Sequence, residues 1–141
     1  MTEHEMEWFD ALIRDRMESA DMLEKPSMRG VQRSVVDKYS DQAHFIYELL
    51  QNADDVKATS ARFRLEKDGL FFTHNGSVGF TVSNPQSEDG DTNSGALGHI
   101  NSITSIANSN KTETSIGKFG VGFKAVFQYT QTPHIYDPNI R

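Results

Sequence analysis

The sequence lacks several features that would point to particular classes of protein. None of its 141 residues is cysteine, which excludes disulfides, thiolate metal sites and a thiol nucleophile. Four prolines and ten glycines are ordinary numbers and exclude collagen-like or low-complexity chains. Basic residues are outnumbered, 14 Lys and Arg against 20 Asp and Glu, so we expect no direct nucleic-acid partner.

The apolar residues are moderately abundant and widely distributed. They make up 36% of the chain, which predicts one compact domain over residues 1–141 with a modest core. The apolar runs are only a few residues long, so no membrane-spanning helix is expected. The first five residues are acidic and polar, unlike the basic and then apolar start of a signal peptide. We therefore expect a cytoplasmic location.

Three segments have the patterns of helices. Thr2 and Glu5 form a capping-box pair. The apolar residues that follow recur at spacings of three and four and predict an amphipathic helix that Lys25-Pro26 ends. A second helix is predicted from about Ser40 to Val56, and a short one at 97–106. The predicted apolar stripe of the first helix comprises Met6, Phe9, Ile13, Met17 and Ala20.

The remaining patterns predict a hairpin and connecting segments. Residues 59–66 alternate between apolar and polar, 67–69 have turn composition, and 70–73 form the predicted partner strand. Residues 83–95 are predicted to be a loop. A glycine cluster precedes a last helix at 123–129, and 134–136 are predicted to begin a strand. The fold class expected from this order is α+β, with an antiparallel sheet covered on one face by helices.

Polar side chains follow one face of the second predicted helix. Glu48, Asn52 and Asp55 are spaced by four and three residues, so they fall in one narrow sector of the helix surface. Apolar residues fill the neighbouring sector, which places this polar row at the border between core and solvent. Such a border can be the wall of a pocket. It can also be an ordinary solvated face.

Two further clusters contain glycine. His74-Asn75-Gly76 follows a predicted strand and can be simply an Asn-Gly turn. The segment 116–123 carries three glycines before a helix, and backbone N–H groups in that arrangement suit phosphate oxygens. It is not a P-loop, because Gly117-Lys118 is followed by Phe119. Nor is it a dinucleotide fingerprint, since the order is G-x-x-G-x-G after a polar segment.

In this order the three clusters resemble the nucleotide-binding motifs of the GHKL ATPases, which include gyrase, MutL, histidine kinases and heat-shock chaperones. The motifs are Glu48-Leu-Leu-Gln-Asn-Ala-Asp-Asp55, His74-Asn-Gly76 and Ile116-Gly-Lys-Phe-Gly-Val-Gly-Phe-Lys-Ala-Val-Phe127. The last motif is most similar to the ninety-kilodalton heat-shock chaperones, and residues 39–55 resemble the sacsin-type branch. The resemblance implies a Bergerat-type two-layer ATP-binding fold and a Mg²⁺-ATP or Mg²⁺-ADP ligand.

The resemblance also implies roles for individual residues. Glu48 would polarise the water that attacks the γ-phosphate, and Asn52 would coordinate Mg²⁺. Asp55 would support the magnesium or ribose side, and residues 80–116 would form a lid over the nucleotide. Lys118 would add a positive charge, or it is a solvated lysine. The backbone segment that would close over the phosphates comprises Gly117, Lys118, Phe119, Gly120, Val121, Gly122 and Phe123.

Two departures from the family pattern bear on these roles. The family usually has an aspartate at His74, where the carboxylate accepts the adenine amino group. A neutral imidazole offers one acceptor, so adenine specificity is in question, although Asn75 could accept through its amide oxygen. The family domain also continues for further strands, whereas this sequence stops at Arg141. We therefore expect a fragment of a longer protein, with the missing C-terminal domains as its partners.

Three functions remain open from the sequence. The first is an ATPase module whose lid closure drives a conformational change in the parent protein, and we rank it first for that parent. The second is a nucleotide-gated interaction module with little hydrolysis, ranked first for this chain alone. The third is an interaction module whose glycines are structural. None of the five histidines suits a phosphoacceptor or a metal pair. Homodimerisation is expected from the family alone.

Overall fold

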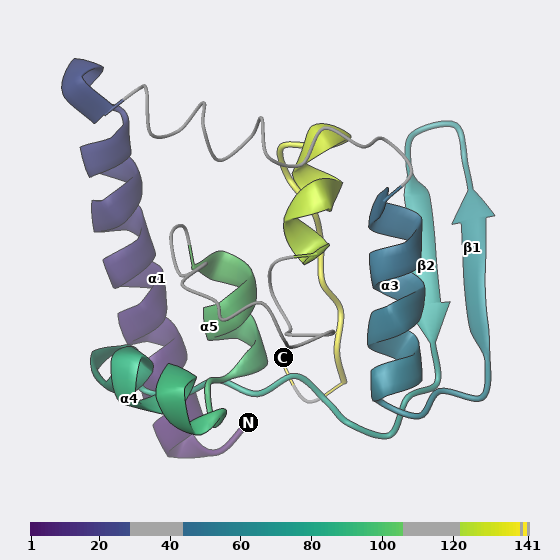
Figure 1. Cartoon of the computed structure of the whole chain (residues 1–141), viewed down its shortest axis with the longest axis horizontal. Helices are drawn as coiled ribbons and strands as arrows, with labels where there is room; N and C mark the ends of the chain where they lie inside the picture. Colours follow the sequence, from purple (N-terminus) through teal and green to yellow (C-terminus); the bar gives the residue numbers. More distant parts are fainter. Residues whose placement is uncertain (29–43, 106–121, 139, 141) are drawn as a thin grey trace.

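The computed structural model describes residues 1–28, 44–105, 122–138 and 140 (Figure 1). The described part is a mixed α+β arrangement. Helices α1 and α5 lie on one side of the molecule, and α3 lies beside a two-stranded sheet on the other (Figure 1). The elements are α1 (Glu3–Leu23), η1 (Pro26–Met28), α3 (His44–Asp55), β1 (Ala61–Leu65), β2 (Leu70–His74), η2 (Pro85–Ser87), α4 (Glu88–Ser94), α5 (His99–Thr104) and η3 (Gly122–Gln128), where η denotes a 3₁₀-helix.

The first helix begins as predicted. The Glu5 N–H donates to the Thr2 hydroxyl at 3.2 Å, and the Thr2 N–H donates to the Glu5 carboxylate at 2.6 Å, which completes the capping box. These bonds from Thr2 to the carboxylate hold the pKa of Glu5 below its usual value. The helix ends at Leu23, shortly before Pro26, so both predicted boundaries are confirmed.

Of the predicted apolar stripe of α1, Phe9 packs on the core but most of the row does not. Met6, Ile13 and Met17 are exposed among the described residues, whereas Leu12 is almost fully buried. Leu12 packs with Val82 and Ile100, and partly buried residues from both ends of the chain and from position 80 surround them. The buried face of α1 is therefore centred on Leu12, and Arg16, one turn later, pairs with Glu88 of α4. The residues around this cluster are Met1, Trp8, Phe9, Phe80 and Ile140.

The hairpin is confirmed with an antiparallel register. Phe63 pairs with Phe72, and their rings are 4.6 Å apart. The turn closes when the Glu66 N–H donates to the Gly69 carbonyl at 2.8 Å. The alternation of 59–66 predicts that Ala61, Phe63 and Leu65 share one face of the strand; in β1 Phe63 is half-buried, whereas Ala61 and Leu65 are exposed.

Three local predictions were wrong. Residues 83–95 contain η2 and α4 instead of a loop, because the Asn84 side chain accepts the Gln86 N–H and acidic residues fill the first turn of α4. The predicted last helix is the 3₁₀ segment η3, ending at Gln128. Residues 134–136 form no strand, and only an isolated bridge joins Asp137 to Ile140. The predicted start of the second helix near Ser40 lies outside the described residues.

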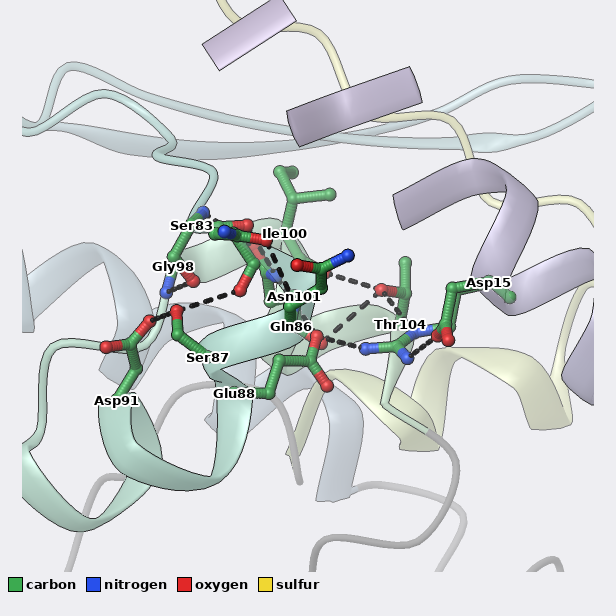
Figure 2. A network of polar contacts seen from close by, with 12 residues as sticks. Asp15, Ser83, Gln86, Ser87, Glu88, Asp91, Gly98, Ile100, Asn101 and Thr104 are labelled. Carbon is green, nitrogen blue, oxygen red and sulfur yellow. Dashed lines mark hydrogen bonds and ion pairs between the residues drawn. The ribbon is translucent and has the colours of Figure 1, made fainter. Parts of the chain in front are cut away.

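A polar network joins α1, α4 and α5 (Figure 2). Asn101 is completely buried, and its amide donates to the Ser83 carbonyl at 2.9 Å and to Glu88 at 3.0 Å. Its side-chain oxygen accepts the Ser83 N–H at 2.9 Å. Glu88 also forms an ion pair with Arg16 of α1. Every polar atom of the Asn101 side chain thus contributes to holding residues 83–101 together, which a buried amide requires.

We predict that Asn101→Ala lowers the free energy of unfolding by about 1–3 kcal/mol, because it leaves the part-buried Ser83 N–H and carbonyl without their partner. Chemical denaturation measures the change. Asn93→Ala is the matched control, since Asn93 lies on the same segment and is exposed, and it should change the stability by less than about 0.5 kcal/mol. Equal effects of the two substitutions would contradict the assignment.

His99 makes the fold sensitive to acid. Its Nδ1 lies 3.2 Å from the Thr81 nitrogen, whose N–H donates to it, and the ring is half-buried. Burial lowers the pKa of His99, and the negative charge of Asp137 partly opposes this shift. The folded state therefore binds its proton less readily than the unfolded state, where the pKa is about 6.5.

We predict that stability is at its full value above about pH 6.5 and falls as the pH drops through the lowered pKa of His99. Urea unfolding of the wild type and His99→Gln between pH 5 and 8 measures this difference. The wild type should lose more stability on acidification than the variant does. Parallel pH curves for the two proteins would show that His99 does not carry the effect.

Candidate functional site

Helix α3 places the first predicted cluster at the edge of the packed surface. Glu48 and Asn52 are half-buried, and Asp55 is exposed. Ala53 and Val56 on the neighbouring sector are buried. The predicted border between core and solvent is therefore confirmed for this helix. The arrangement leaves the Asn52 amide and the Asp55 carboxylate on the solvent side of a fixed helix, one turn apart.

The second cluster is fixed to the end of α3 by the close packing of Gly76. A Cβ at this position would lie 2.2 Å from Val56 Cγ2 and 2.9 Å from His74 Nδ1, so only glycine fits without a shift. The Ser77 N–H also donates to the Val56 carbonyl at 3.2 Å. Because the Val56 N–H bonds to the Asn52 carbonyl, the end of β2 is tied to the turn of α3 that carries Asn52.

The Asn75 side chain is used by the neighbouring backbone. Its oxygen accepts the N–H groups of Thr59 and Ser60 at 3.0 and 2.8 Å, and its amide donates to the Thr59 hydroxyl at 2.9 Å. An amide oxygen has two lone pairs, and both are taken. In this structure the Asn75 oxygen therefore has no free lone pair with which it could accept an adenine amino group. Instead Asn75 closes the connection from α3 into β1.

Only the end of the third cluster is described. Gly117, Lys118, Phe119, Gly120 and Val121 lie outside the described residues, and Gly122 and Phe123 begin η3. This element packs against α3 and runs in the opposite direction (Figure 1). The Phe45 and Tyr129 rings, 4.6 Å apart, join the start of α3 to the residue that follows η3. The start of η3 therefore lies alongside a later part of α3.

A shallow hollow of about 250 Å³ lies at the open end of the hairpin. It includes two predicted residues, His74 and Asn75, but none of Glu48, Asn52 and Asp55. Arg62 is not among the predicted site residues. It lies on the face of β1 that Phe63 does not share, and it pairs with Thr73 in the register of the hairpin. The residues that line the hollow are Ser60, Arg62, Thr73, His74 and Asn75.

The side-chain oxygens of α3 could supply some of the ligands of a magnesium ion, with the remaining ligands coming from phosphate and water. Asn52 and Asp55 supply hard oxygens, which Mg²⁺ prefers. Within residues 1–28, 44–105, 122–138 and 140, no three His, Asp or Glu side chains converge as a metal cage. Phosphate oxygens and water would have to complete the octahedron, as they commonly do for Mg²⁺. Over the same residues, no helix is long and apolar enough to cross a bilayer.

Two known proteins are similar to this chain. Protein NO VEIN of Arabidopsis thaliana is 32% identical over 115 residues, and human Sacsin is 29% identical over 130 residues. Each match covers 77% of this chain but only 4% and 3% of the two relatives, so the chain spans a very small part of either. No family model matches the sequence, and no solved structure is similar to it. The chain therefore contains a distant sacsin-like region.

We predict that Gly76→Ala lowers the free energy of unfolding by about 1–3 kcal/mol, because the new methyl group overlaps the Val56 side chain. Thermal or urea unfolding measures the loss. Gly69→Ala is the control, since a Cβ at Gly69 meets nothing within 4 Å. The double variant Gly76→Ala/Val56→Ala should be more stable than the sum of the two single effects implies. Additive effects would contradict the contact.

Proposed function

We propose that this chain is a GHKL-type nucleotide-binding module that takes ATP or ADP with Mg²⁺. The observation that supports it most is the position of α3. This helix carries the first motif, its end packs on Gly76 of the second motif, and its side packs on η3, which begins within the third. Segments that are far apart in the sequence thus meet on one helix. The proposed architecture is the two-layer Bergerat sandwich, of which the described hairpin and helices would form a part.

The proposed ligand would be held mainly by charge and by backbone groups. Asn52 would contribute an oxygen to Mg²⁺, and Asp55 would support the magnesium or ribose side. The segment from Gly117 to Phe123 would contribute backbone N–H groups to the phosphates, with Lys118 adding a positive charge. His74 and Gly76 would face the base. A bound Mg²⁺ supplies charge neutralisation for the phosphates.

Hydrolysis would depend on Glu48, which would orient the water that attacks the γ-phosphate. Its half-buried place on α3, one turn before Asn52, suits a positioned carboxylate. The alternative is a nucleotide-gated interaction module with negligible turnover. In either case the chain would act as part of a larger sacsin-like protein.

Residues 80–116 would form the lid over the nucleotide. The described portion, 80–105, packs on α1 through Leu12 and through the Arg16–Glu88 ion pair. In the proposed function α1 therefore moves together with the base of the lid or limits how far the lid opens. A few polar contacts at an element's end can serve as such a hinge.

The test is calorimetric titration of the 141-residue chain with ATP and ADP in the presence of Mg²⁺. We predict saturable binding that Asn52→Ala weakens by about tenfold or more, because a metal ligand is lost. Gln51→Ala removes the same amide one residue away and should leave the affinity unchanged. Glu48→Ala should bind nucleotide normally and release phosphate more slowly than the wild type.

The outcomes separate the proposals. Binding without any phosphate release, in wild type and Glu48→Ala alike, would favour the non-hydrolysing switch. If Mg²⁺ and nucleotide bind to neither the wild type nor the variants, the nucleotide-binding function is wrong. Equal affinities of wild type and Asn52→Ala would remove Asn52 from the site.

A further inference from the structure

The Asn75-Gly76 peptide bond joins two residues that can react with each other. The Gly76 nitrogen can attack the side-chain carbonyl carbon of Asn75, and a following glycine hinders that attack least because it has no side chain. The new C–N bond closes a succinimide ring, and the Asn75 amide group leaves as ammonia with the proton of the Gly76 nitrogen. Water then opens the ring at one of its carbonyl groups, which gives aspartate or isoaspartate at this position.

The folded chain points the two reacting groups in different directions. The Asn75 oxygen accepts the Thr59 and Ser60 N–H groups at 3.0 and 2.8 Å, and its amide nitrogen donates to the Thr59 hydroxyl at 2.9 Å. The Gly76 N–H donates instead to His74 Nδ1, with 3.1 Å between the nitrogens. In the ring the side-chain carbon takes the place of that hydrogen on a trans peptide, so ring closure requires this N–H to point at Asn75. The folded geometry is therefore unreactive.

The packing of Gly76 opposes the rotation that would bring the groups together. The peptide unit between Asn75 and Gly76 has to turn, which breaks the Gly76 N–H bond and moves the glycine Cα. Little space is free for that movement, since a Cβ on Gly76 would lie 2.2 Å from Val56 Cγ2. Val56 is itself buried, and its carbonyl accepts the Ser77 N–H at 3.2 Å. Ring closure therefore requires the end of the hairpin to separate from Val56 first, a local opening of the kind that folded proteins sample.

We propose that Asn75 is a deamidation site whose reaction is controlled by the contact between Gly76 and Val56. The site is protected while the contact is closed, and it reacts when the contact opens. Where opening and closing are faster than the reaction, the rate follows the fraction of chains that are open. Water is the co-reactant, and the inference is independent of nucleotide binding.

The isoaspartate product cannot restore the contact. Its backbone runs through the former side-chain methylene, which lengthens the chain at this residue by about 1.5 Å. The segment is held on both sides, by the Asn75 N–H bond to the Ser60 carbonyl at 3.2 Å and by the Ser77 N–H bond to Val56. Because the space beside Gly76 does not admit a methyl group, the added methylene displaces one of these attachments. Deamidation to isoaspartate thus loosens the hairpin from α3.

The experiment ages the 141-residue chain in mildly alkaline buffer, once folded and once unfolded in urea, and follows Asn75 by peptide mass spectrometry. We expect Asn75 to react at least about tenfold more slowly in the folded chain, because at most about a tenth of the chains are open. Enzymatic methylation of isoaspartate measures that product separately. The isoaspartate chain, once refolded, should have a lower thermal midpoint than the unreacted chain.

Two valine substitutions separate local opening from general instability. Val56→Ala removes methyl groups from the contact with Gly76 and should raise the rate at Asn75 in the folded chain by about threefold or more, with no change in urea. Val82→Ala is the matched control, because Val82 is also buried but packs on Leu12 in the other cluster. It should leave the rate at Asn75 within about twofold of the wild type.

A folded rate equal to or above the unfolded rate would overturn the inference, and would show that the bonds around Asn75 promote the reaction instead of preventing it. Equal acceleration by Val56→Ala and Val82→Ala would also overturn it, because the opening would then be global. If Val56→Ala does not fold, the ratio of folded to unfolded rates in the wild type and the rate of Val82→Ala decide.

Discussion

The close approach of Gly76 to Val56 is the contact on which the candidate site depends. It joins the end of β2 to the end of α3 with no room for a side chain, and the Ser77 N–H bond to Val56 reinforces it. The Asn75 bonds to Thr59 and Ser60 hold the other strand end to the same connection, and such anchoring matters because isolated hairpins are marginal in water. In the same turn the Gly76 N–H donates to His74 Nδ1.

A second and separate set of interactions holds the other half of the described chain. There the apolar cluster of Leu12, Val82 and Ile100 is small. The hydrogen bonds of the buried Asn101 side chain do much to fix how residues 83–101 are arranged. A buried amide with every group satisfied favours one arrangement strongly over its alternatives. Residues 83–95, although their composition is typical of a loop, therefore fold into short helices that contacts with α1 and α5 hold in place.

The sequence was informative wherever local pattern decides structure. The capping box at Thr2, the hairpin around Gly69 and the buried sector of α3 all follow from spacing and turn chemistry. It was misleading where tertiary contacts decide. Nothing in the spacing indicates that Leu12 would be buried in place of Ile13, since Leu12 packs on Val82 and Ile100, which are far away in the sequence. The α4 helix was missed because its residues are polar and have no apolar period, although the acidic residues of its first turn favour a helix.

The candidate site shows the same division. The positions of Glu48, Asn52 and Asp55 on α3 could be predicted from a helical period, and the similarity to a sacsin-like region agrees with the resemblance read from the motifs. The directions in which Asn75 and His74 bond could not be predicted, because a tight turn sets them through atoms two residues away. The hydrogen bonds of these two side chains are thus decided by backbone geometry that residue identity alone does not reveal.

The central claim is that one nucleotide lies across the end of α3, the turn after β2 and the start of η3. Nuclear magnetic resonance with Mn²⁺ in place of Mg²⁺ tests it directly, because the bound ion broadens the amide signals near it. With ATP present, we predict strong broadening at Asn52, Gly76 and Gly122 together and little along α1. Broadening that is confined to α1 and α4, or spread evenly over the acidic surface, would contradict the account.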